Sequence, residues 1–173
     1  MNRPGPAAPL EMGHTGFMSG GSGSWASSYG TRRSMQSNKG RDTKPELTIR
    51  KILHAQGLRY RVNTRPIPGL RRTADIVFTR VRFAIFIDGC FWHGCPEHYQ
   101  RPTSNRDYWD LKVSRNRERD IETSQNLVAN GWRFLRVWEH ELREDPDAVA
   151  ARIRRELQMP ESARDGIDRM PPA

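Results

Sequence analysis

The fold is decided by residues 74–88, which run Ala-Asp-Ile-Val-Phe-Thr-Arg-Val-Arg-Phe-Ala-Ile-Phe-Ile-Asp. Two largely apolar runs, 74–78 and 82–88, flank a short polar interval, and this pattern predicts two buried strands in a hairpin that turns near residues 79–81. A carboxylate inside the first strand, that of Asp75, is costly unless it is paired or binds a metal. The hairpin therefore predicts the middle of a sheet and a functional position within it.

Helical patterns lie on both sides of the hairpin. Thr43-x-x-Glu46 with Pro45 predicts a capping box at the start of a helix that ends at Gly57. We expect a strand at 58–62, a charged helix at 107–130, a strand at 132–138 and a last helix from Pro146, capped by Asp145. This order of elements predicts an α/β fold, a mixed central sheet flanked by helices.

The expected domain covers residues 31–158. Residues 1–30 are rich in Gly, Ser and Pro, which predicts a disordered leader, and residues 159–173 are expected to form a flexible tail. No signal-peptide pattern begins the chain, and no stretch approaches the roughly 20 apolar residues of a membrane span. We therefore expect a cytoplasmic, nucleoid-associated protein with no membrane contact. Since no coiled-coil pattern or long apolar surface is visible, we expect a monomer.

The charge balance favours a polyanionic partner. The chain holds 29 Lys and Arg against 20 Asp and Glu, a net charge of +9. Such an excess most often indicates nucleic acid binding. Lys112, Arg115 and Arg119 recur at three- and four-residue intervals on the predicted charged helix, where they would neutralise phosphates.

Both cysteines follow the second strand of the hairpin, in the run Asp88-Gly-Cys-Phe-Trp-His-Gly-Cys-Pro-Glu-His98. In a cytoplasmic chain, the spacing Cys90-x4-Cys95-x2-His98 favours zinc over a disulfide. Structural zinc takes four ligands, so a fourth must come from His140, just past the strand at 132–138, or from the nearer His93. The alternative is that both cysteines are small buried side chains without a metal.

Three further carboxylates could join Asp75. Asp88 ends the next strand, and Glu46 and Asp120 lie on predicted helices that could pack nearby. Such a group can hold Mg²⁺, which prefers oxygen ligands. Glu46 has an alternative role in the capping box, and Asp120 an alternative place on a solvated helix face.

The loop between the cysteines carries groups that packing alone would not need. His93 could be a metal ligand or a general base. Phe91 and Trp92 cannot both point into one strand-type core. They could be wedges that enter between base steps, or they could cover the metal site.

Over residues 33–142 the chain resembles a known family, the very short patch repair (Vsr-type) DNA mismatch endonucleases. The resemblance rests on Met35, Arg41-Asp42-Thr43 with Glu46, Ala74-Asp75-Ile76-Val77-Phe78, Gly89-Cys-Phe-Trp-His93, Asn116-x-x-x-Asp120 and Gly131-Trp-Arg-x-Leu-x-Val-Trp-Glu139. It implies a restriction-endonuclease-like fold with a structural zinc. It also implies a Mg²⁺-dependent enzyme that nicks one strand of duplex DNA 5′ of the T in a T:G mismatch, with mismatch-repair proteins as further candidate partners.

The resemblance also implies roles for single residues. Asp75 and the main-chain carbonyl of Ile87, where the family has a threonine, would hold Mg²⁺. His93 would activate the attacking water, supported by Asp120 and Glu46. The wedge would be Met35, Phe91 and Trp92, and the zinc ligands Cys90, Cys95, His98 and His140. Arg115 and Arg119 of the basic set would then contact DNA.

One position departs from the family. Asp88 stands where the family has a histidine, so it would be a further metal ligand, or would hold the tautomer of His93. Two other functions also fit much of the sequence. One is a zinc-stabilised DNA-binding module without catalysis, and the other is a sequence-specific restriction endonuclease on the same fold.

Overall fold

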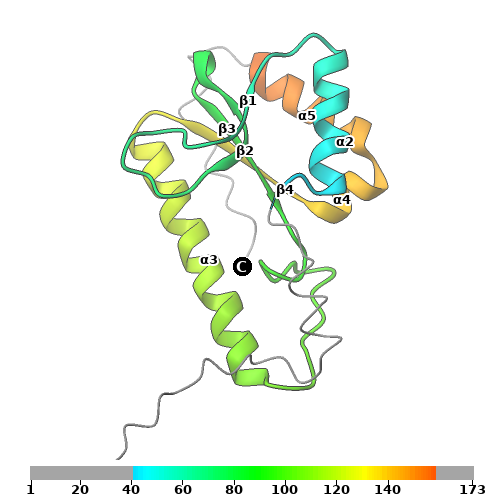
Figure 1. The fold of residues 1–173 in the computed structure, drawn as a ribbon, viewed down its shortest axis with the longest axis vertical. Helices are drawn as coiled ribbons and strands as arrows, with labels where there is room; N and C mark the ends of the chain where they lie inside the picture. Colours follow the sequence, from blue (N-terminus) through cyan, green and yellow to red (C-terminus); the bar gives the residue numbers. More distant parts are fainter. Residues whose placement is uncertain (1–40, 159–173) are drawn as a thin grey trace, which may run out of the picture. The chain divides into compact units, whose positions relative to one another are not determined.

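A computed structural model describes residues 41–158, so the expected leader, the expected tail and Met35 lie outside the described part. Four strands form one sheet in the order β1-β2-β3-β4. They are β1 (Arg61–Thr64), β2 (Ala74–Phe78), β3 (Phe83–Asp88) and β4 (Arg133–Trp138). β1, β2 and β3 are antiparallel neighbours, whereas β4 pairs with β3 in parallel, which confirms the mixed sheet (Figure 1).

Helices cover both faces of this sheet. α3 (Arg106–Ala129) connects β3 to β4 on one face, and α2 (Lys44–Ala55), α4 (Glu139–Glu144) and α5 (Pro146–Gln158) lie on the other (Figure 1). The strands alternate accordingly: Ile85 packs with the α2 and α5 side, whereas Ala84 and Phe86 pack with Leu127 of α3. The predicted α/β architecture with flanking helices is confirmed. Within residues 41–158, no helix combines the length and apolarity needed to cross a membrane.

Most expected elements are present, with shifted ends. The turn of the hairpin is a short 3-10 helix at Thr79–Val81, at the expected place. β1 begins at Arg61, later than expected, because Leu58 and Tyr60 pack against the core on the α2 side before the chain enters the sheet. α4 was not predicted, since Leu142 is the only large aliphatic residue in its six positions.

The start of α2 differs from the predicted capping box. Thr43 is the N-cap residue but makes no side-chain capping bond. Its hydroxyl instead donates to Glu46 Oε1 at 2.9 Å, and Glu46 Oε2 accepts the backbone N–H of Asp42 at 2.9 Å. The capping box is therefore wrong in detail, and the left-handed φ of 57° at Asp42 is the turn that brings its N–H to Glu46. Asp145 does cap α5, by accepting the N–H of Ala148 at 2.8 Å.

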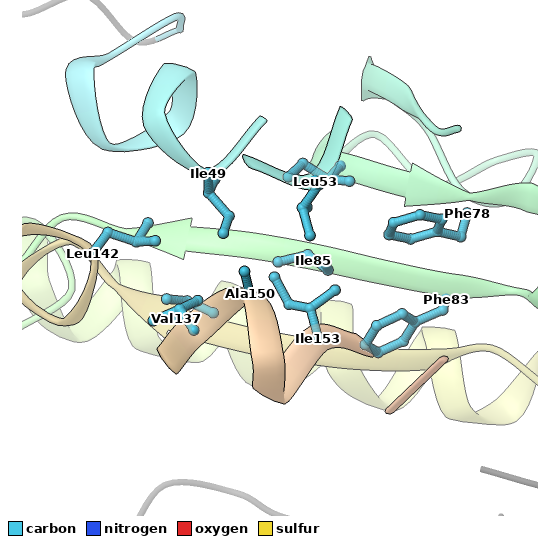
Figure 2. Packing of buried hydrophobic residues seen from close by; sticks show 11 residues of the cluster. Ile49, Leu53, Phe78, Phe83, Ile85, Val137, Leu142, Ala150 and Ile153 are labelled. Carbon is cyan, nitrogen blue, oxygen red and sulfur yellow. The ribbon is translucent and has the colours of Figure 1, made fainter. Parts of the chain in front are cut away.

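The main core lies between the sheet and the helices α2 and α5. Figure 2 shows Ile49 and Leu53 of α2 directed at Ile85 of β3, with Ile153 of α5 beside them. Each of these four side chains is at most 1% exposed. Removing this apolar surface from water is the main term that fixes α2 and α5 to the sheet.

Shortening Leu53 tests this packing. We expect Leu53→Ala to lower the free energy of unfolding by about 2–5 kcal/mol, because it leaves a cavity in a site that is 0% exposed. The measurement is urea unfolding with linear extrapolation. Leu47→Ala on the same helix is the control, since Leu47 is 43% exposed, and it should cost below about 1 kcal/mol. Equal losses in the two variants would contradict the packing described.

Candidate functional site

The sheet topology collects the candidate residues at one edge. Because β2 and β3 are antiparallel, the start of β2 at Ala74 and the end of β3 at Asp88 lie at the same edge. Because β3 and β4 are parallel, with Asp88 opposite Trp138, β4 ends there too. Residues that directly follow β3 and β4 therefore meet, although about fifty positions separate them in sequence.

The first group at this edge is a Cys/His cluster. The ligand atoms of Cys90, Cys95, His98 and His140 all lie within 4.8 Å of one another. Nδ1 of His140 is 3.2 Å from Sγ of Cys90 and 3.6 Å from Sγ of Cys95, and Nδ1 of His98 is 3.9 Å from Sγ of Cys95. Two sulfurs and two ring nitrogens in this arrangement could hold a soft divalent metal.

Both cysteines are free thiols and are buried. Burial raises the pKa of Cys90 to about 11, and the nearby Cys95 adds to the rise, while the backbone N–H of His140 opposes it. Such thiols become thiolates when a cation lies between them. Of the two histidines considered for the fourth ligand, the structure brings His140 into the cluster, whereas His93 lies with Asp120.

The second group surrounds Asp75. Its Oδ2 accepts the backbone N–H of Ile87 at 2.7 Å, which links the start of β2 to the end of β3. Burial raises the pKa of Asp75 to about 6; the Ile87 N–H offsets part of this rise, and the charges of Glu46 and Asp88 add to it. Within residues 41–158 no Lys, Arg or His forms an ion pair with Asp75. A buried carboxylate beside two others favours a bound cation or a bound proton.

Glu46 reaches this site from α2, on the face of the sheet opposite α3. It is 5% exposed and pairs with Nη2 of Arg50 at 2.8 Å. The same Nη2 lies 3.5 Å from the main-chain oxygen of Asp75, and Nη1 of Arg50 pairs with Asp42 at 2.6 Å. Glu46 is therefore brought near Asp75, and it also fixes the start of α2 through Asp42 and Thr43, although not as the predicted capping box.

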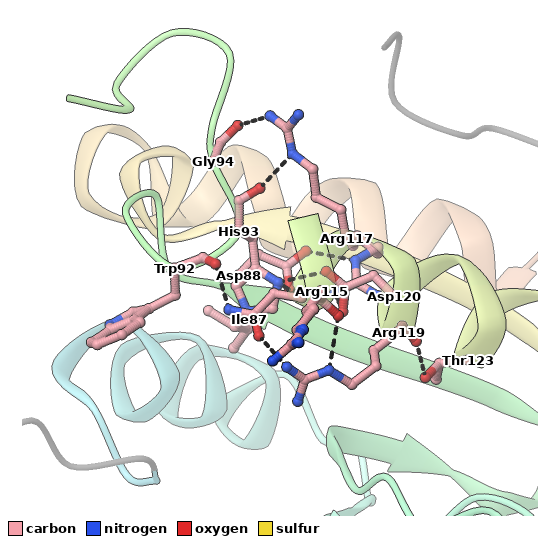
Figure 3. Close-up of polar contacts among 12 residues, drawn as sticks. Ile87, Asp88, Trp92, His93, Gly94, Arg115, Arg117, Arg119, Asp120 and Thr123 are labelled. Atoms are coloured by element: carbon pink, nitrogen blue, oxygen red, sulfur yellow. Dashed lines mark hydrogen bonds and ion pairs between the residues drawn. The ribbon is translucent and has the colours of Figure 1, made fainter. Parts of the chain in front are cut away.

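On the α3 face, His93 and Asp120 form a close pair. Nδ1 of His93 lies 2.6 Å from Oδ2 of Asp120 (Figure 3). Burial alone would lower the pKa of His93, but the hydrogen bond to Asp120 and the charge of Asp88 outweigh it and raise the pKa. The solvated-face alternative for Asp120 is therefore wrong: α3 turns this carboxylate toward the loop and the sheet.

Asp88 is held by a residue that the sequence analysis missed. Arg136 of β4 binds both oxygens of Asp88, with Nε and Nη2 each at 2.6 Å, and Nη2 also lies 2.8 Å from Oδ1 of Asp120. Oδ1 of Asp88 is 3.8 Å from Nδ1 of His93, beyond a hydrogen bond. Burying an arginine inside the apolar run 132–138 costs free energy unless a carboxylate pairs with it, as holds for the buried Asp75 and its need for a partner. This cost is the feature of the sequence that could have pointed to Arg136.

The loop that carries His93 is fastened to α3. Nδ2 of Asn116 donates to the carbonyl of Trp92 at 2.7 Å, and Arg117 donates to the carbonyls of His93 at 3.2 Å and Gly94 at 2.5 Å (Figure 3). Gly94 has a φ of 65°, and a Cβ there would lie 2.8 Å from Arg117 Nη2. The loop can approach α3 this closely only with glycine at this position.

The aromatic pair lies over the start of α3. The ring centroid of Phe91 is 5.3 Å from that of Trp92 and 5.1 Å from that of Trp109. Both Phe91 and Trp92 are half-buried, and Phe91 also lines a hollow with Cys90, His98 and His140. Phe91 thus covers the Cys/His cluster in part, whereas the indole of Trp92 points away from Asp88 and Asp120 (Figure 3).

The basic residues of α3 that were expected to contact DNA differ in exposure. Arg115 is exposed, and Arg119 donates to the carbonyl of Arg115 and to the side chain of Asn116, each at 2.8 Å. Arg119 is next to Asp120 in sequence and Arg115 lies about one and a half helical turns before it, so a polyanion held by them would pass close to His93.

Known proteins are similar to this chain in sequence. Residues 29–100 match the family model for the DNA mismatch endonuclease Vsr. The type II nicking enzyme V.NaeI of Lentzea aerocolonigenes is 51% identical over 124 residues, which cover 70% of this chain and 74% of that protein. The DNA mismatch endonuclease Vsr of Escherichia coli (strain K12) is 36% identical over 112 residues, covering 64% of this chain and 70% of that protein.

The chain belongs to the Vsr family of DNA mismatch endonucleases. As a Vsr-family protein it is a DNA endonuclease, a hydrolase of phosphodiester bonds, and its substrate is DNA. Among solved structures, the catalytic domain of the homing endonuclease I-Bth0305I aligns with a TM-score of 0.44 and 19% identity, over 66% of this chain and 93% of that domain.

The environment of Asp75 in this Vsr-family enzyme predicts that removing its charge raises the free energy of unfolding, by an amount that depends on pH. A pKa of about 6 in the folded state exceeds the unfolded value, so the protonated form stabilises the fold at low pH and this contribution is lost as pH rises through about 6. With EDTA present, Asp75→Asn should therefore raise the free energy of unfolding by about 1–3 kcal/mol at pH 8. The gain should shrink as the pH falls from 6 to 4, as followed by urea unfolding.

The exposed Asp147 of α5 provides the matched control. Asp147→Asn should change stability by less than about 0.5 kcal/mol at either pH. A stability gain for Asp75→Asn that is as large at pH 4 as at pH 8 would show that the charge of Asp75 is not its source.

Proposed function

We propose that the enzyme nicks one strand of duplex DNA on the 5′ side of the T in a T:G mismatch, with Mg²⁺, as a step of very short patch repair. The observation that carries this proposal is the pairing of His93 with Asp120 beside the buried carboxylate of Asp75. The mixed sheet with its helical crossover between β3 and β4 supports the restriction-endonuclease-like fold that the sequence resemblance implies.

Mg²⁺ would be held by Asp75 and the main-chain carbonyl of Ile87. Two observations support this assignment: the Asp75 carboxylate already bonds the N–H of Ile87, and its raised pKa shows that a cation nearby would relieve a buried charge. Asp88 and Glu46 add negative potential at the same place. When bound, Mg²⁺ stabilises the charge that develops on the phosphate and on the leaving 3′ oxygen.

His93 is proposed to deprotonate the attacking water. Burial alone would raise the pKa of Asp120, but the hydrogen bond from His93 and the charge of Arg136 outweigh it and lower the pKa. The carboxylate is an acceptor only, so the proton on His93 resides on Nδ1 and leaves Nε2 free to take a proton. Asp120 thus orients the base, and Glu46 supports the acidic site from α2.

DNA contacts are assigned to three parts of the chain. Arg115 and Arg119 would bind phosphates along α3. Phe91 and Trp92 would form the wedge that probes the mismatch, together with Met35, which lies outside the described residues. The half-buried Phe91 and Trp92 have rings that pack on Trp109, which would brace such a wedge.

The Cys/His cluster is proposed to hold a structural zinc. For bond lengths of about 2.3 Å to sulfur and 2.0–2.1 Å to nitrogen, a tetrahedral site places S and N about 3.5 Å apart. The observed separations of 3.2, 3.6 and 3.9 Å fit this value. A zinc here would join the loop after β3 to the start of α4.

Nicking of defined duplexes tests the function. We expect cleavage of a labelled T:G duplex on the T strand, 5′ of the T, in Mg²⁺ and not in EDTA, with the matched T:A duplex left at least about a hundredfold slower. Asp75→Ala should abolish nicking while binding to the T:G duplex survives, because Asp75 holds the metal and the arginines hold the DNA. The readouts are denaturing gels and fluorescence anisotropy.

Each other outcome assigns a different function. Equal cutting of the matched duplex on both strands would favour a sequence-specific restriction endonuclease. Binding without cutting in any duplex would favour a DNA-binding module, and Mg²⁺-dependent cutting by Asp75→Ala would contradict the role of Asp75.

Metal analysis tests the zinc site. Protein purified without chelators should carry about one zinc per chain. His98→Asn and Cys95→Ser should lower this content and the melting temperature, since each removes one of four ligands. His54→Asn, at an exposed histidine of α2, is the matched control and should keep the metal. Wild-type protein without zinc, or full zinc content in Cys95→Ser, would contradict the assignment.

A further inference from the structure

Arg136 occupies an unusual place for an arginine. It lies in the middle of β4, on the face that packs against α3, and only 13% of its side chain is exposed. Its guanidinium carbon stands 5.2 Å from the ring centroid of Phe86, so the aromatic face supports the guanidinium plane from the sheet side. A guanidinium kept away from water in this way needs strong partners on its edges.

Those partners are two carboxylates from different elements. Asp88, at the end of β3, accepts hydrogen bonds from Nε and Nη2 of Arg136 at 2.6 Å each. This bidentate pair fixes the position and the angle of the guanidinium. The same Nη2 reaches Oδ1 of Asp120 on α3 at 2.8 Å. Arg136 therefore joins the sheet to α3 through one rigid planar group.

The two carboxylate oxygens of Asp120 bind different partners. Oδ1 is held by Arg136, and Oδ2 is 2.6 Å from Nδ1 of His93. Without the bridge, Asp120 could rotate, and the ring of His93 would lose its fixed partner on Nδ1. A chain of polar contacts thus connects the sheet to the histidine, through Asp88, Arg136, Asp120 and His93.

We infer that Arg136 is a positioning residue of this nuclease: anchored by Asp88, it holds Asp120 so that His93 keeps its proton on Nδ1 and presents Nε2. Asp88 acts through Arg136, since both of its oxygens bind the guanidinium. The inference rests on the proposed role of His93 as the base, and it adds two residues that shape that role without touching the DNA.

Nicking under single-turnover conditions, with enzyme saturating the T:G duplex, is the first test. Arg136→Gln should lower the rate of cleavage by about a hundredfold or more, within the range that positioned acid–base groups supply. The dissociation constant for the duplex should change by less than about threefold, since most of the Arg136 side chain is buried. A loss confined to binding would overturn the inference.

A double variant separates positioning from folding. Arg136→Gln leaves Asp88 buried without its partner, so that variant will also be less stable. Adding Asp88→Asn removes this unpaired charge, and the melting temperature should recover while cleavage stays slow. Recovery of the rate together with the melting temperature would show a purely structural role.

Arg152 provides a matched control. Its Nη1 pairs with Oε1 of Glu141 at 2.9 Å, on the face of the sheet opposite α3. Arg152→Gln removes an arginine–carboxylate pair that has one contact and is more exposed, away from His93, and should cleave at the wild-type rate. Equal slowing in Arg152→Gln would overturn a specific role for Arg136.

The tautomer of His93 gives a readout that does not depend on cleavage. In ¹⁵N spectra of the histidine rings, assigned with His93→Gln, the wild type should show a protonated Nδ1 and a bare Nε2 at pH 8. Arg136→Gln should show exchange between the two tautomers. If the wild type fails to nick the T:G duplex, the proposed function fails, and the spectra still decide whether Arg136 fixes His93.

Discussion

The parallel pairing of β3 with β4 is the constraint on which the rest of the structure depends. It sets Asp88 opposite Trp138, so the residues that follow β3 and β4 lie together. The loop after β3 supplies Cys90 and His93, and the turn after β4 supplies His140. Because a parallel pair needs a crossover, α3 must return over one face of the sheet, which brings Asp120 to His93.

Within residues 41–158, the buried Glu46, Arg50 and Asp88 belong to two ion-pair systems on opposite faces of the sheet. On the α2 face, Arg50 joins Asp42 and Glu46, and on the α3 face, Arg136 joins Asp88 and Asp120. Asp75 lies between them at the sheet edge and has no cationic side chain within ion-pair distance in the described part of the chain. Two arginines thus pair with the surrounding acids, whereas Asp75 has no such partner within residues 41–158.

Much of the fold could be predicted because it depends on local patterns. The apolar runs of β2, β3 and β4 and the breaks at Gly57 and Gly131 mark the elements in sequence. α4 escaped prediction because it is short and carries a single aliphatic residue, Leu142, so it has no periodicity to detect. The hydrogen bonds that Glu46 accepts could not be predicted, because they depend on the left-handed turn at Asp42, which residue types do not reveal.

The site divides in the same way. Cysteine and histidine spacing predicted a group that includes Cys90 and Cys95, and Asp75 was recognisable as a charge inside a strand. The choice of His140 over His93 needed the register of β3 with β4. Arg136 was missed because its partners lie on other elements, and only the neighbouring strand and α3 show that they are the buried Asp88 and the half-buried Asp120.

The separation of these partners along the chain has a consequence for synthesis in the cell. Arg136 and His140 lie about fifty positions beyond Asp88 and Cys90, so a chain still leaving the ribosome holds the acidic residues and the loop but neither the bridge nor the complete cysteine cluster. Contacts over such separations form late in folding. A nascent chain of this kind therefore lacks the assembled group of candidate residues until β4 has docked.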